Sequence, residues 1–87
     1  MGKELVGKIT HFYNKISVAV LELEGTLKDG DKISIEKEGE EPVEQVAASM
    51  QIEHESIKEA KKGQAIGMKV DKPVKENSLV YKVTEEG

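Results

Sequence analysis

Apolar and polar residues alternate along most of this chain, which is typical of β-strands that bury one face. The alternating runs are residues 5–11, 32–36, 45–53, 66–70 and 79–83. The residues expected on the buried faces of the later strands include Val46, Met50, Leu79, Tyr81 and Val83. Residues 16–23 are apolar almost without a break, so this segment is either covered on both sides or contains a bulge that changes the buried face. The pattern predicts an all-β protein.

Turn-forming residues separate these runs at intervals of about ten residues, the spacing of β-sandwiches and small β-barrels. The connections are residues 25–31, 38–42 and 72–78. The residues expected to shape turns are Gly25, Gly30, Asp31 and Gly63. No repeat or linker divides the chain, so residues 1–87 are predicted to form one domain.

The segment 43–62 fits two kinds of secondary structure. The apolar positions with the spacing of one helix face are Val43, Val46, Ala47 and Met50. Apolar residues at consecutive alternate positions favour a strand over 44–54, and we adopt that interpretation. At most one short helical turn is expected at 57–60, ended by Gly63.

Some residues that invite a functional interpretation are expected to be structural. Gly7 and Gly67 stand inside strands, where glycine marks a bulge or a close approach of two backbones. Met50 and Met68 are expected to fill the core. The aromatic residues Phe12 and Tyr81 are expected in the core as well, which leaves few rings for stacking on bases.

Composition excludes several classes of site. The chain has 87 residues, no cysteine and a formal net charge of −4, so it offers no disulfide and no thiolate metal ligand. The sequence shows neither a secretory signal nor an apolar run long enough for a membrane span, which predicts a cytoplasmic protein. It contains no P-loop motif, so no nucleotide is expected.

The search for catalytic groups finds little. His11 and His54 are the only histidines, and both are interpreted as solvated polar residues. Glu53 and Glu55 flank His54, but neighbours on a strand point to alternate faces and do not converge on a metal. We therefore predict no metal, no cofactor and no enzyme activity.

Charge is divided unevenly along the chain. Residues 1–55 contain six lysines against twelve acidic residues, whereas residues 56–83 contain seven lysines against three acidic residues. Arginine is absent, which weakens any prediction of specific nucleic-acid recognition. The lysine-rich part is either a contact surface for phosphates or a solvated face.

Several sequence blocks together resemble domain II of translational GTPases, the β-barrel that follows the GTP-binding domain in elongation factor Tu and initiation factor two. The blocks are Gly7-Lys-Ile9, Val18-Ala-Val20, Gly25-Thr-Leu-Lys-Asp-Gly-Asp31, 46–53, 57–70 and 80–83. The likeness spans about residues 5–83 and departs from the family at Asn77-Ser78 and in lacking the GTPase domain. The resemblance implies a small, closed, antiparallel β-barrel of roughly six strands.

The resemblance also implies an RNA or ribosome contact, with ribosomal RNA, tRNA or a translation factor as partner. The residues assigned to this contact are Lys58, Glu59, Lys61, Lys62, Lys69, Lys72 and Lys75. The alternative is a protein-interaction domain that docks on another enzyme and binds no RNA. The oligomeric state is left open.

Overall fold

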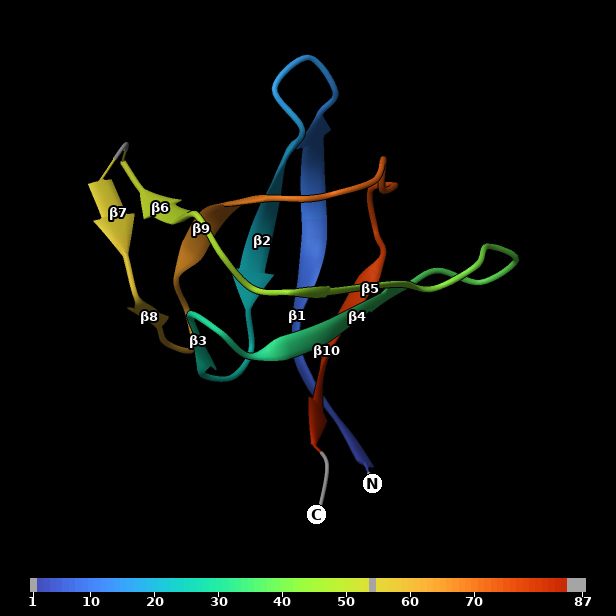
Figure 1. Ribbon diagram of the computed structural model, residues 1–87, viewed down its shortest axis with the longest axis horizontal. Coiled ribbons are helices and arrows are strands. Elements are labelled where there is room, and N and C mark those ends of the chain that lie inside the picture. Colours follow the sequence, from blue (N-terminus) through green and yellow to red (C-terminus); the bar gives the residue numbers. More distant parts are fainter. Residues whose placement is uncertain (1, 54, 85–87) are drawn as a thin grey trace.

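The structure, a computed structural model, describes residues 2–53 and 55–84 and contains ten β-strands (Figure 1). The strands are β1 (Gly2–Tyr13), β2 (Val18–Leu23), β3 (Leu27–Lys28), β4 (Lys32–Glu36), β5 (Val43–Val46), β6 (Met50–Ile52), β7 (Glu55–Ile57), β8 (Glu59–Ala60), β9 (Ala65–Lys69) and β10 (Leu79–Thr84). No helix occurs among the described residues, so the all-β prediction is confirmed. His54, interpreted above as a solvated residue, lies outside the described residues.

Eight of the strands form one antiparallel sheet in the order β5-β4-β10-β1-β2-β9-β6-β7, and β3 pairs with β8 separately. The large sheet curls into a half-barrel (Figure 1), so the barrel-like fold is confirmed. The strand count exceeds the predicted six or so because several alternating runs are broken into short strands.

Strand β1 lies between β10 and β2 in the sheet, and it bends along its length. Its first half pairs with β10 and its second half with β2, and the register shifts between Leu5 and Gly7 and between Ile9 and His11. Such bulges bend a strand and increase its twist. A Cβ built on Gly7 would lie 2.6 Å from the backbone oxygen of Glu22, so this glycine lets two backbones approach closely.

The segment 43–62 forms strands, as favoured over the helix, but not one continuous strand. Ser49 and Glu53 have φ angles of 56° and 49°, and these left-handed residues separate β5, β6 and β7. No helical turn forms at 57–60, where at most one short turn was expected. Those residues end β7 and form β8, because Glu59 and Ala60 pair with β3.

The barrel encloses one apolar core. Its buried residues are Val6, Ile9, Ala19, Leu21, Leu23, Leu27, Ile33, Ile35, Ala47, Met50, Ala60, Ile66, Met68, Val70, Val74 and Val80. In β5 and β10 the wrong residues were predicted to face the core. Val46 is 54% exposed and Leu79 36% exposed, whereas their neighbours Gln45 and Val80 face inward. Tyr81, expected in the core, is half-buried on the outside of the sheet.

A single side chain joins the edge strand β5 to the segment after β9. The Gln45 amide nitrogen donates to the Lys69 carbonyl at 3.0 Å, and the Asp71 backbone N–H donates to the Gln45 amide oxygen at 2.9 Å. Gln45 is only 8% exposed, so these bonds satisfy a buried amide. The seam of the barrel is therefore bridged here by a side chain.

Candidate functional site

The residues assigned to RNA binding come from several elements and loops. Lys58 lies between β7 and β8, Lys61 and Lys62 lie in the turn after β8, and Lys69 ends β9. Glu59 in β8 pairs with Lys28 of β3, and Lys72 lies in the exposed segment after β9. Lys75 lies on the far part of that segment, where its Nζ is 3.1 Å from the Glu40 carboxylate. All seven residues are exposed, and they extend from the β8 turn to the 70–78 connection (Figure 1).

The predicted turn residues have distinct geometries. Gly30 and Gly63 have positive φ angles of 95° and 91°, a conformation that glycine adopts without a Cβ penalty. The Asp31 carboxylate accepts a hydrogen bond from the Lys28 backbone N–H at 2.9 Å. Gly25 has no positive φ, and an added Cβ there would make only ordinary contacts, 3.5 Å from the Leu5 oxygen.

Apolar side chains gather on the outside of β1, β10, β4 and β5, a surface that we call the outer face. The register places Leu5, Tyr81 and Ser34 side by side on it, and alternation adds Leu79 and Val46. Leu5, Leu79 and Val46 are 39%, 36% and 54% exposed. Exposed apolar patches of this kind mark interaction surfaces more often than isolated apolar residues do.

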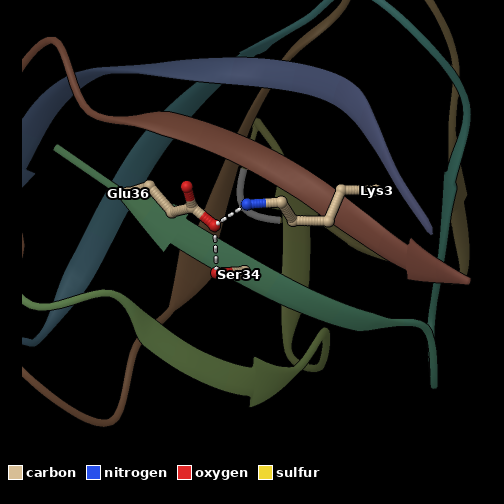
Figure 2. A network of polar contacts seen from close by, with 3 residues as sticks. All are labelled: Lys3, Ser34 and Glu36. Carbon is tan, nitrogen blue, oxygen red and sulfur yellow. Dashed lines mark hydrogen bonds and ion pairs between the residues drawn. The ribbon is translucent and has the colours of Figure 1, made fainter. Parts of the chain in front are cut away.

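A polar network crosses the outer face (Figure 2). Lys3 Nζ donates to Glu36 Oε2 at 2.7 Å, and the Ser34 hydroxyl donates to the same oxygen at 2.9 Å. Lys3 Nζ also lies 5.0 Å from the centre of the Tyr81 ring. The hydrogen bond from Lys3, with help from Ser34, lowers the pKa of Glu36, and the same bond raises the pKa of Lys3. The pair therefore favours the charged form of both groups, and it lies beside the Tyr81 ring.

A second feature is a hollow of about 200 Å³ between the β4–β5 connection and the 73–78 segment, which we call the loop hollow. Its apolar lining includes Ile35, Val43 and Val74. Its charged lining residues are Lys37, Glu40, Glu41 and Lys75. The Glu40–Lys75 ion pair joins the two segments that form it.

A third feature is the β1–β2 hairpin tip, at the end of the barrel away from both termini (Figure 1). Tyr13 and Ile16 are 49% and 61% exposed there, beside a hollow of about 300 Å³ lined by residues 12–16. His11 supports the tip, since its ring meets Tyr13 edge-on at 4.4 Å and its Nδ1 lies 3.0 Å from the Glu76 carboxylate.

The described residues place no three metal-ligating side chains together, and within the same ranges no helix has the length and apolar character to cross a membrane. The chemistry that these surfaces offer is binding through apolar patches and charged pairs.

Comparison with known proteins found a similar sequence and two similar structures. No family model matches the chain. Over 80 residues it is 42% identical to an uncharacterized protease of Methanocaldococcus jannaschii, and the match covers 92% of this chain. The chain spans 20% of that relative's length.

Two crystal structures have the same fold. Both are of the C-terminal domain of a "putative U32 peptidase" of Geobacillus thermoleovorans, one as the selenomethionine variant. The TM-scores are 0.86 and 0.85, each at 18% identity, and the matches cover 93% and 91% of this chain and 93% and 99% of those chains.

These matches correct three predictions. The resemblance to domain II of translational GTPases is wrong, because the similar proteins are a protease and a peptidase domain. The predicted translation-associated, RNA-binding function is wrong for the same reason. The prediction that the chain is not an enzyme is also contradicted, since the three matches described above are named as a protease or a putative peptidase, although the likeness to a C-terminal domain assigns no catalytic residue here.

The prediction failed because turn glycines and alternating strands specify a barrel, and one fold carries many functions. The outer face was missed for a related reason. Leu5-Val6 and Leu79-Val80 are adjacent apolar pairs, and one member of each pair must point outward from a strand. These adjacent apolar pairs are the sequence feature that could have predicted the outer face.

Proposed function

We propose that this chain is an accessory domain that docks on the remainder of a peptidase-type enzyme, whether the two are linked or separate. The supporting observation is the 42% identity to a protease of which the chain spans only 20%. A protein-interaction role was the alternative considered for the sequence, and it requires a surface that can bury apolar groups.

The outer face provides that surface. Its exposed apolar residues Leu5, Leu79 and Val46 share this face with the Lys3–Glu36 pair, which resembles the mixture of apolar and paired polar groups in protein interfaces. Gly2 pairs with Thr84, so the described ends of β1 and β10 lie side by side at one end of the barrel (Figure 1). A polypeptide linked at either end would emerge beside the outer face.

Photocrosslinking in the native cells tests this proposal. Leu79→p-benzoylphenylalanine places a photoreactive group on the outer face, and we expect crosslinks to a peptidase-type polypeptide or to a peptidase region of the same chain. Adding Leu5→Glu and Val46→Glu should lower the crosslink yield about tenfold, because buried charges oppose docking.

The matched control is Lys62→p-benzoylphenylalanine, which carries the same group on the exposed turn after β8. Equal crosslinking from both positions, crosslinks from Leu79 to ribosomal components, or none from Leu79 would contradict docking through the outer face. The cytoplasmic location and the single domain over residues 1–87 stay predictions.

A further inference from the structure

The loop hollow has the size of a side-chain pocket. Ile35 and Val74 are 3% and 8% exposed and Val43 is half-buried, so apolar groups form its deeper part. Pockets for small molecules and cofactors measure about 300–1,000 Å³. The loop hollow, at about 200 Å³, therefore suits one or two aliphatic side chains better than a whole cofactor.

The charged rim disfavours a polyanion. Two lysines, Lys37 and Lys75, face two glutamates, Glu40 and Glu41, so the rim has no net formal charge. Nucleic acids and anionic lipid surfaces bind to net positive surfaces. A peptide with side chains of both signs complements this rim. The Glu40–Lys75 pair is well exposed, and an exposed pair exchanges partners at small cost.

The hollow also adjoins an edge of the sheet. Val43 lines it and is the first residue of β5, which stands at the end of the strand order. Edge strands bind extended peptides through main-chain hydrogen bonds, and side-chain pockets beside the edge select the sequence. The 73–78 segment provides the opposite wall of the pocket, through Val74 and Lys75.

We infer that the loop hollow is a peptide-binding site that takes an aliphatic side chain of an extended segment, with flanking charged residues held by the rim. The inference rests on the proposed function, because a polypeptide substrate is what a peptidase would present to such a site. The site is distinct from the outer face: the pocket residues Ile35 and Val43 have the inward phase of β4 and β5, whereas Val46 has the outward phase.

Titration of the isotope-labelled 87-residue chain with acetyl-Lys-Val-Leu-Val-Glu-amide, followed by NMR, tests the inference. We expect amide shifts centred on Ile35, Val43 and Val74. Binding should weaken about tenfold when serine replaces the peptide's leucine, because the apolar contact is lost. Val43→Phe should fill the pocket and weaken binding of the leucine peptide by about the same factor. Val20→Phe is the matched control, a half-buried valine on β2, and should bind normally.

Shifts centred on another surface, equal affinity for the two peptides, or no shift at the highest soluble peptide concentration would overturn the site. Displacement of the peptide by a short RNA would do so too. The mapping uses the unaltered chain, so it decides the question even if Val43→Phe fails to fold. It also needs no enzyme partner, so a negative result here leaves outer-face docking standing, whereas a failed crosslink from Leu79 removes the proposed function.

Discussion

At the residue scale, the polar contacts of Lys3, Ser34 and Glu36 hold charged groups on the outer face beside the Tyr81 ring. Lys3 comes from the start of β1 and Glu36 from the end of β4, and they meet across β10 over the Tyr81 ring (Figure 2). The carboxylate is stabilised in its charged form by two hydrogen bonds, one from Lys3 and one from Ser34. Protonation would weaken both.

The sign of the pH dependence follows from the lowered pKa of Glu36. The unfolded chain binds this proton at a higher pH than the folded chain does, so the stabilisation is present above the unfolded pKa and is lost as pH falls through the folded value. We expect Lys3→Met to raise the pKa of Glu36 towards its ordinary value. An NMR titration of the Glu36 carboxyl carbon measures this.

Lys75→Met, which removes the partner of Glu40, is the control and should leave the titration of Glu36 unchanged. An unaltered Glu36 pKa in Lys3→Met would show that Lys3 does not hold the carboxylate in its charged form.

Among the elements, β1 determines how the barrel bends. It pairs with β10 over residues 2–8 and with β2 over residues 7–13, and its two register shifts lie on either side of the shared residues Gly7 and Lys8. Gly7 lies at the first shift, where the opposing backbone leaves no room for a Cβ. The sequence predicted a bulge or close packing at this glycine but could not identify the strand it approaches.

Gly7→Ala should therefore destabilise the protein. The added Cβ would press on the Glu22 backbone oxygen, and forcing extra atoms into a packed site costs about 1–3 kcal/mol. Urea unfolding measures the loss. Gly25→Ala is the matched control, since its Cβ would meet ordinary contact distances and its φ is not positive. Equal stability of the two variants would show that β1 and β2 can separate without cost.

For the whole molecule, one contact that joins distant parts of the sheet is the seam at Gln45. The ends of the strand order, β5 and β7, share no ladder within the described residues, and the Gln45 amide joins β5 to residues 69 and 71. Backbone bonds between Ala47 and the 30–31 turn hold the chain just after β5. The β3–β8 ladder joins the two ends of the large sheet, and the buried Gln45 side chain adds a second link between β5 and the end of β9.

Gln45→Leu keeps the size of the side chain and removes both bonds. It should cost about 1–3 kcal/mol, because the Lys69 carbonyl and the Asp71 N–H lose their partner. Urea unfolding gives the free energy, and faster hydrogen exchange of the Asp71 amide locates the change. Gln51→Leu, on the exposed side of β6, should be nearly neutral. A stable Gln45→Leu variant with a protected Asp71 amide would rule out this role for the seam.

At the scale of the whole molecule, the barrel by itself does not identify a function. Alternation and turn glycines led to a barrel, and the barrel was confirmed, but barrels of this kind occur in unrelated proteins. The lysines chosen as a contact surface are close in sequence between 58 and 62, whereas Lys75 is paired with Glu40 at the loop hollow.

The sequence by itself determined the all-β class, the strand regions and most of the core, because alternation and turn chemistry act between residues close in the chain. The tertiary structure alone decided which phase of β5 and β10 faces inward, with Gln45 and Val80 inside and Val46 and Leu79 outside. It also formed the Lys3–Glu36 pair, the Gln45 seam and the loop hollow. Each joins residues more than twenty positions apart, and only the register and curvature of the folded sheet bring such residues into contact.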